Sequence, residues 1–94
     1  MYFYKVRGET IAFMHAESID DGCVEIFQIM VNDEYKRRGI GRSLVDHLWA
    51  NVYPTETIIV ESHPSIESTT FWERLGFVPT GKENRGSVEY IFVR

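Results

Sequence analysis

The pattern of apolar and polar residues in the first third of the chain predicts three consecutive β-strands separated by turn signals. Met1–Arg7 alternates aromatic with polar residues, and Thr10–Glu17 is the second predicted strand, after the turn signal Gly8–Glu9. We therefore expect these two segments to form a hairpin. A second turn signal, Asp20–Gly22, precedes Cys23–Val31, a segment apolar enough to predict a strand in the middle of a sheet.

The middle of the chain changes from an alternating to a helical pattern. Five apolar residues fall on one face of a helix that follows two glycines, and Tyr53–Pro54 is expected to end it, because a residue before proline disfavours the helical conformation. The apolar segment Thr57–Glu61 then predicts a short buried strand. Since a helical crossover joins it to Cys23–Val31, the two strands are expected to run parallel. The five apolar positions are Ile40, Leu44, Val45, Leu48 and Trp49.

The last part of the chain predicts one more helix followed by two strands. Ser65–Leu75 is the predicted helix, and Gly76 stands just past its end, where glycine commonly terminates helices. Phe77–Pro79 begins a strand, Gly81–Gly86 is predicted as a hairpin loop, and Ser87–Val93 returns as the final strand. The predicted order is βββαβαββ, an α/β (α+β) fold with a mixed sheet and two helices, forming a single domain over residues 1–94.

Composition and charge narrow the classes of protein that fit. The chain has 94 residues, enough for one small core, and a single cysteine, Cys23, which excludes an intrachain disulfide and favours a buried thiol. No stretch reaches the roughly 20 apolar residues of a membrane span, and the first residues lack the layout of a signal peptide. We expect a cytoplasmic protein without a membrane partner, and the net charge of −4 disfavours a nucleic-acid partner.

The segment between the central strand and the first helix has the composition of an anion-binding turn. Residues Lys36–Arg42 place two glycines among basic side chains at the start of the helix. Glycines let the backbone approach a ligand closely, and the first N–H groups of a helix have no intrahelical partner. Two other phosphate motifs do not fit: a dinucleotide fingerprint needs a third glycine where Leu44 stands, and a Walker loop needs Gly-Lys-Ser/Thr.

Two motifs and the predicted order of elements resemble those of the GNAT N-acetyltransferases. The turn Lys36–Gly41, with the strand before it and the helix after it, is similar to the family's acetyl-CoA-binding motif, in which Arg or Gln usually fills the place of Lys36. The segment Phe71–Phe77 is similar to the family's next motif, aromatic-Tyr-x-x-x-Gly-Phe, with Trp72 in place of tyrosine. The chain resembles a short variant without the usual first strand and first two helices, which normally help to build the acceptor groove.

The resemblance implies a binding site for acetyl-CoA as co-substrate. Backbone groups near the end of the third strand are expected to pair with the pantetheine arm, and N–H groups of the glycine turn to hold the pyrophosphate. No Cys/His cluster has metal-ligand spacing, so no metal is expected. The implied cofactor-binding residues are Ile29, Met30, Val31, Lys36, Arg37, Arg38, Gly39, Ile40, Gly41 and Arg42.

Glu25 is the candidate catalytic residue, since it interrupts an otherwise apolar strand. In the histone-acetylating branch of the family a glutamate on this strand acts as general base, and the spacing from Glu25 to Gly41 matches without a gap. An amine is protonated at neutral pH, and a carboxylate with a pKa raised by partial burial could remove that proton; a merely solvent-facing glutamate is the alternative. Trp72 cannot replace the tyrosine as an acid, because its indole only donates a hydrogen bond, and a packing role is favoured.

These features favour an acetyl-CoA-dependent N-acetyltransferase that acts on a primary amine, with a protein or peptide amine among the candidate acceptors. The alternative is a non-catalytic acyl-CoA-binding regulatory protein, which Trp72 and the short fold would suit. A nucleic-acid-binding module that uses Lys36–Arg42 is disfavoured by the acidic balance. Tyr2 and Tyr4 are predicted to be exposed on an edge strand, which makes a homodimer one option for assembly.

Overall fold

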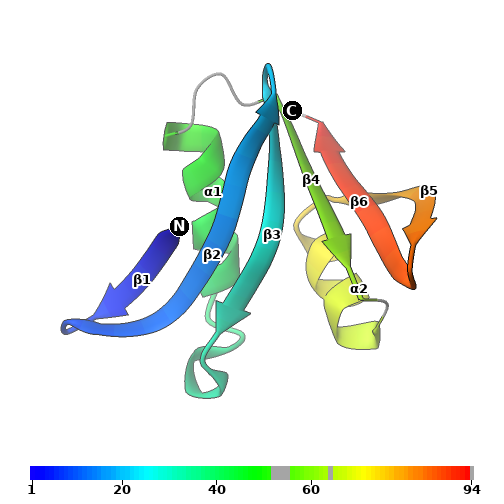
Figure 1. The fold of residues 1–94 in the computed structure, drawn as a ribbon. Coiled ribbons are helices and arrows are strands. Elements are labelled where there is room, and N and C mark those ends of the chain that lie inside the picture. The colour runs from blue at the N-terminus through cyan, green and yellow to red at the C-terminus, as the bar shows by residue number, and fades with distance from the viewer. Residues whose placement is uncertain (52–55, 64, 94) are drawn as a thin grey trace.

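The computed structural model describes residues 1–51, 56–63 and 65–93, which form a six-stranded sheet with helices on one face (Figure 1). The strands lie in the order β1-β2-β3-β4-β6-β5. β3 and β4 are parallel, and the other neighbouring strands are antiparallel. The strands are β1 (Tyr2–Val6), β2 (Glu9–Asp20), β3 (Cys23–Val31), β4 (Thr57–Ser62), β5 (Val78–Asn84) and β6 (Ser87–Val93).

In the described part of the chain, three helical segments join the strands: η1, a 3-10 helix (Asp33–Tyr35), α1 (Ile40–Asn51) and α2 (Ile66–Arg74). α1 connects β3 to β4 and supplies the crossover that two parallel neighbours need. α1 and α2 lie on the same face of the sheet (Figure 1). Within the described residues, no helix is long and apolar enough to cross a membrane.

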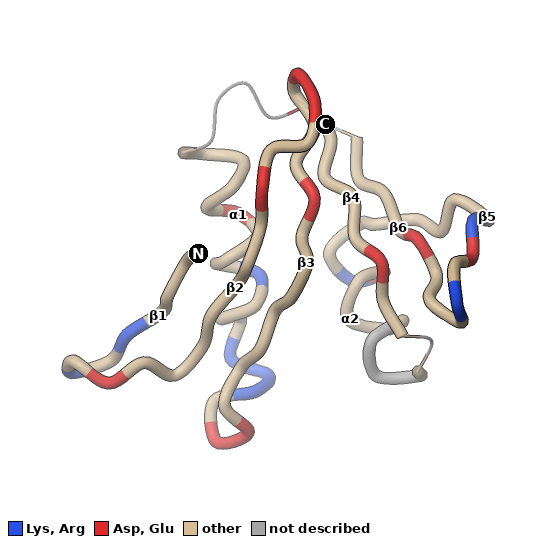
Figure 2. The backbone as a smooth tube through the Cα atoms, in the orientation of Figure 1, with Lys and Arg blue, Asp and Glu red and all other residues tan. Residues whose placement is uncertain are grey.

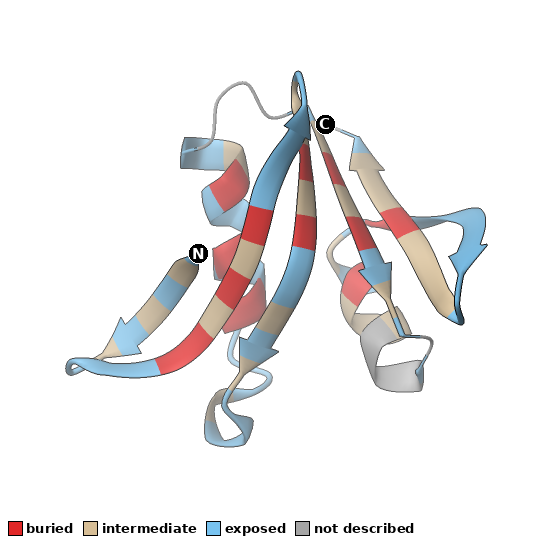
Figure 3. Cartoon of the chain, viewed as in Figure 1, coloured by how far each residue is buried: buried red, intermediate tan, exposed pale blue. Residues whose placement is uncertain are grey.

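The hydrophobic core lies between the helices and the covered face of the sheet. Every second residue is buried there in the middle of β2, in β3 up to Ile26 and in β4 up to Val60, as the bands of Figure 3 show. The apolar stripe of α1 packs against these residues, and Trp72 and Phe77 extend the core toward β6. The largest fully buried side chains are Met14, Ile26, Leu48, Ile58 and Phe77.

The opposite face of the sheet, which we call the open face, carries no helix among the described residues. Its side chains alternate with the buried ones and are half-buried or exposed; Phe13, Ile59 and Ile91 are half-buried. An antiparallel sheet with one solvated face is usually polar on that face. The open face instead mixes aromatic and aliphatic residues with the carboxylates described below.

β3 and β4 are paired over only part of their length. Their register runs from Cys23 opposite Thr57 to Ile26 opposite Val60. After Ile26 the register of β3 with β4 ends, although β3 itself continues to Val31. The second half of β3 therefore has one edge that β4 does not pair.

A β-bulge lies at the point where this pairing ends. On β2, His15 lies opposite Gln28 and Ala16 lies opposite Ile26, so Phe27 is an extra residue in β3. An extra residue locally bends a strand and changes the direction of its side chains and backbone groups. The bulge thus separates the paired half of β3 from the half that diverges from β4.

The glycines of the turn before α1 have two different structural roles. Gly39 has a φ of 77°, a left-handed conformation that glycine adopts without strain, and Arg37 nearby has a φ of 65°. Gly41 is required by packing, because a Cβ atom there would lie 2.7 Å from the ring of Phe71 on α2. The second glycine therefore allows α1 and α2 to approach each other.

The structure confirms the predicted order βββαβαββ and the parallel pair of strands. β3 and β6 have the predicted bounds, and Gly76 has the positive φ, 96°, expected just past the end of α2. The predicted end of the first helix at Tyr53–Pro54 lies outside the described residues. η1 was not predicted; the side chain of Asn32 caps it by accepting a hydrogen bond from the Glu34 N–H.

The prediction of a loop over Gly81–Gly86 is wrong. β5 continues to Asn84, and only Arg85 and Gly86 form the turn, each with a positive φ. The register with β6 shifts along β5, and all residues of β5 are exposed. Polar residues with low strand propensity form this strand because β6 supplies a partner at the edge of the sheet.

The prediction that Tyr2 and Tyr4 are exposed is also wrong. Both are half-buried and pack against the core, whereas Phe3 between them is 57% exposed. The alternation along β1 is as predicted, but Tyr2 and Tyr4 lie on the face that packs against the core, and Phe3 lies on the exposed face. β1 is an edge strand as predicted, and a homodimer stays a prediction that these two side chains do not support.

Candidate active site

A groove of about 990 Å³ is lined by the diverging ends of β3 and β4. Its remaining walls come from the glycine turn, the first residues of α1, and α2. The volume lies at the upper end of the range of roughly 300–1,000 Å³ usual for ligand sites. The groove is in the place where the sequence predicted the acetyl-CoA site.

The structure brings nine of the ten predicted cofactor-binding residues into the lining of this groove. The exception is Arg38, whose guanidinium lies 5.3 Å from the ring centroid of Tyr35. Tyr35 itself lines the groove, so Arg38 reaches the site only through that ring. The nine lining residues are Ile29, Met30, Val31, Lys36, Arg37, Gly39, Ile40, Gly41 and Arg42.

Backbone N–H groups at the start of α1 are the strongest anion-binding feature of the groove. The first helical hydrogen bond runs from the Ser43 N–H to the Gly39 carbonyl at 3.0 Å, so the amides of residues 40–42 precede the helical ladder. Such amides, together with the positive end of the helix dipole, favour a phosphate group. The start of α1 is therefore a candidate site for a phosphate group.

Two of the basic side chains at the turn already have partners in the protein. Lys36 Nζ lies 2.9 Å from an Asp33 carboxylate oxygen. Arg42 donates a hydrogen bond of 3.1 Å to the carbonyl oxygen of Arg74 at the end of α2, where a cation is favourable. Arg42 thus holds α1 against α2, a structural role that the sequence did not reveal.

Glu25 lies on the open face of β3, two residues before the bulged Phe27. Its side chain is half-buried, and burial raises the pKa of its carboxyl, which the nearby Glu61 and Glu89 raise further. A raised pKa brings a carboxylate closer to the range in which a general base works. Glu25 does not line the groove, but the next residue, Ile26, does.

Carboxylates gather on the open face around Glu25. Glu17 is directly opposite Glu25 on β2, and Glu61 on β4 is directly opposite Glu89 on β6. Figure 2 shows acidic segments on these four strands. Like charges in directly opposite positions are unfavourable. Within the described part of the chain, no ion pair neutralises Glu25, Glu61 or Glu89, so this face attracts cations.

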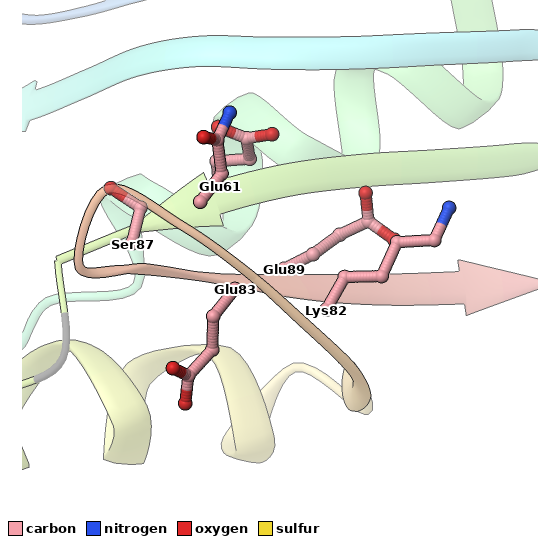
Figure 4. Close-up of a pocket in the computed structure, with 6 residues that line it drawn as sticks. Glu61, Lys82, Glu83, Ser87 and Glu89 are labelled. Carbon is pink, nitrogen blue, oxygen red and sulfur yellow. The ribbon is translucent and has the colours of Figure 1, made fainter.

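Glu61 links the groove to a second, smaller pocket of about 350 Å³ between β4 and the β5–β6 hairpin, because it lines both. Figure 4 shows Glu61 and Glu89 on neighbouring strands, with Lys82 beside Glu89. Glu89 accepts a hydrogen bond of 3.0 Å from the Thr80 hydroxyl. The sequence did not predict that Glu61 and Glu89 lie together, because β4 and β6 are far apart in sequence.

Trp72 is part of the core beneath the groove. It is 3% exposed and lies edge-on to Phe71 and Phe77, with ring centroids 4.8 and 5.1 Å away. Its predicted packing role is confirmed. In the described residues, no group of three or more His, Cys, Asp or Glu side chains could hold a metal ion.

The fold and the groove together define an α/β protein with a site for an anionic ligand where two parallel strands diverge. The chain belongs to the GNAT acetyltransferase family, since residues 1–79 match the acetyltransferase (GNAT) domain. This confirms the family that the two sequence motifs indicated. Among curated proteins, none matches the chain in sequence.

Several solved structures share the fold. The PaiA N-acetyltransferase of Thermoplasma acidophilum in complex with coenzyme A has a TM-score of 0.87 at 14% identity, over 96% of this chain and 57% of its own. The Bacillus subtilis N-acetyltransferase YlbP, also in complex with coenzyme A, has a TM-score of 0.78 at 20% identity, over 99% of this chain and 66% of its own. The Escherichia coli ribosomal-protein-S18-alanine N-acetyltransferase has a TM-score of 0.72 at 23% identity, over 93% of this chain and 62% of its own. The chain spans less than two thirds of each of these proteins.

Proposed function

We propose that the protein is an acetyl-CoA-dependent N-acetyltransferase that acts on a primary amine. The observation that carries the proposal is the groove. One of its sides is the edge of β3 that is not paired with β4, and the N-terminus of α1 lies next to that edge. Family membership supports acetyl transfer as the reaction. Coenzyme A in two of the similar structures supports acetyl-CoA as the donor.

Donor binding uses the backbone more than the side chains. Ile29–Val31 pair with the pantetheine arm as an added strand would, because their edge of β3 lies in the groove without β4 as a partner. The amides of residues 40–42 donate to the pyrophosphate at the end of the helix dipole. Arg37, exposed beside them, adds positive charge.

Acetyl transfer forms a bond between the acceptor nitrogen and the acetyl carbon and breaks the carbon–sulfur bond. Glu25 removes a proton from the ammonium form of the acceptor, and its raised pKa supports this role. A backbone N–H at the bulge of β3 donates to the carbonyl oxygen as negative charge develops there. Once the nitrogen–carbon bond has formed, the nitrogen loses its second proton. Coenzyme A leaves as a thiolate and receives that proton through water, because Trp72 cannot supply one.

A cationic amine is the acceptor that the open face suits best. Glu25, Glu61 and Glu89 form an uncompensated group of carboxylates, and charge complementarity speeds the encounter with a cation. The absence of a helix over this face among the described residues leaves room for an acceptor as large as a lysine side chain of a peptide.

The proposal is tested by measuring thiol release from acetyl-CoA against a panel of polyamines, amino acids and lysine peptides. Glu25→Gln removes the base and should lower the transfer rate about 100-fold, within the range usual for general bases. The matched control is Glu9→Gln on β2, an exposed strand glutamate outside the groove, which should leave the rate unchanged. Equal rates for the two variants would exclude Glu25 as the base.

The alternative function is a non-catalytic acyl-CoA-binding protein, which is favoured by Trp72 because it supplies no acid. Mass spectrometry of the purified protein would detect acyl-CoA bound in either case. Coenzyme A binding without acetyl transfer to any amine of the panel would support the alternative. Transfer to at least one amine at a rate that depends on Glu25 would exclude it.

A further inference from the structure

A short chain of contacts on the open face joins β2 to the bulge of β3. The rings of His15 and Phe27 lie 5.2 Å apart with an angle of 33° between their planes. His15 Nε2 also lies 3.4 Å from a Glu17 carboxylate oxygen. The three side chains therefore lie in contact order Glu17, His15, Phe27.

Phe27 is the one residue of β3 that has an opposite residue on neither neighbouring strand. It is the extra residue in the register with β2, and the register with β4 has already ended at Ile26. Its side chain is 48% exposed, so the hydrophobic core does not hold it. The ring of His15 is the aromatic contact that Phe27 makes within the described chain.

We propose that His15 is a positioning residue, which packs on Phe27 and thereby fixes the bulge amide that polarises the thioester. Glu17 holds the His15 ring in the orientation that this packing needs. The proposal rests on the acetyl transfer proposed above, in which an N–H at the bulge donates to the carbonyl oxygen. Such a donor acts only if its direction is set before the reaction, because a misplacement of about 1 Å can cost as much as 100-fold in rate.

The positioning role has a kinetic signature that differs from loss of binding. The amide at the bulge acts on charge that develops in the transition state, whereas the pantetheine arm and pyrophosphate bind to other residues. Loss of the His15 ring should therefore lower kcat while the KM for acetyl-CoA changes little. A role in sheet stability alone would lower the melting temperature and leave kcat of the folded protein unchanged.

The test compares three variants in the acetyl-transfer assay. His15→Ala should lower kcat about 10- to 100-fold with KM for acetyl-CoA within about twofold. His15→Phe keeps a flat ring against Phe27 and should recover kcat to within about fivefold. The matched control is His47→Ala. His47 also contacts an aromatic ring, that of Tyr2, edge-on at 5.2 Å between centroids, but it lies on α1 and does not line the groove, so the kcat of this variant should equal that of the wild type.

Three kinetic results would overturn the proposal while acetyl transfer itself stands. They are an unchanged kcat in His15→Ala, a rise in KM for acetyl-CoA in place of a fall in kcat, or an equal loss in His15→Phe and His15→Ala. Each would show that the ring does not set the geometry of the bulge.

Hydrogen exchange at the amides of Phe27 and Gln28 tests the same inference without any activity. His15→Ala should speed exchange there at least tenfold, and His47→Ala should not. If the wild type acetylates no amine, the proposed function fails, and this exchange result alone decides whether His15 fixes the bulge. Equal exchange rates in wild type and His15→Ala would refute the positioning role in either case.

Discussion

The two faces of the sheet are made by the same strands but have opposite characters. On the covered face, Ile26, Ile58 and Leu48 are almost completely buried, and the packing is largely apolar. On the open face, the intervening residues of the same strands include Glu25 and Glu61, which lie near each other without a neutralising ion pair in the described chain. Stability thus depends mainly on the covered face, whereas the proposed base and the proposed acceptor site lie on the open face.

The difference shows how a small domain can contain a costly site. Partial burial, and then the neighbouring carboxylates, raise the pKa of Glu25, and this raised pKa is the sign of a cost in stability. The covered face compensates because its side chains are removed from water in a continuous cluster. Substitutions on the two faces should therefore differ both in size and in sign.

The largest effect is expected from a truncation in the core. Leu48→Ala removes a side chain with 0% exposure and should lower the free energy of unfolding by about 2–5 kcal/mol. Ile91→Ala on the open face removes a half-buried side chain and should cost about 1 kcal/mol, since part of that surface already meets water. Urea denaturation measures both values. Similar losses would contradict the assignment of stability to the covered face.

A smaller loss is expected where the two helices meet. Gly41→Ala places a Cβ 2.7 Å from the ring of Phe71, and overpacking of this kind costs about 1–3 kcal/mol. The double variant Gly41→Ala with Phe71→Leu reduces the clash and should recover part of the loss, which thermal unfolding would detect. If Gly41→Ala is as stable as the wild type, this glycine serves the ligand and not the packing of α1 on α2.

The order of the elements could be predicted from the sequence because the signals for the elements are local. The apolar segment Cys23–Val31 follows a turn signal, the apolar residues of α1 have helical spacing, and both elements were predicted correctly. The turn at Gly39 and the end of α2 at Gly76 were predicted because a positive φ at glycine is a local property as well.

The features that the sequence did not reveal depend on contacts between distant segments. The bulge at Phe27 exists only in the register of β3 against β2, and no local pattern marks it. Glu61 and Glu89 meet because β6 inserts beside β4, a neighbour that is not next in sequence. Residues 81–84 resemble a loop because they are polar and glycine-containing, and they form a strand only because β6 is available as a partner.

A modest kinetic effect is expected from the carboxylate shared by the groove and the smaller pocket. Glu61→Gln removes one charge near the proposed acceptor and should raise the KM for a diamine acceptor about threefold, the size usual for a solvent-exposed ion pair. The effect should shrink at high salt because salt screens exposed charges. The control is Glu83→Gln, since the Glu83 side chain points away from Glu61 in Figure 4. An equal rise in KM in both variants would indicate that the overall negative charge of this surface attracts the acceptor, and not a local contact with Glu61.

The smallest effect, and the one opposite in sign, is expected for the stability of Glu25→Gln. Because the pKa of Glu25 is raised in the folded protein, the folded state binds more protons than the unfolded state between the two pKa values. Stability therefore falls as pH rises from the unfolded pKa of about 4.3 through the raised folded pKa. Above that window the carboxylate costs stability, by only a few tenths of a kcal/mol because solvent screens it.

Glu25→Gln removes the ionised carboxylate and its cost in stability. The variant should therefore unfold at a slightly higher temperature than the wild type at pH 7, and at the same temperature below pH 4. Thermal melts at the two pH values measure the difference, with Glu9→Gln, which lies outside the carboxylate group, as the control. A variant that is less stable at pH 7 would show that Glu25 supports the sheet. If Glu25→Gln is more stable but transfers acetyl groups more slowly, then Glu25 lowers the stability of the fold and raises its activity, whereas the residues of the covered face stabilise the fold.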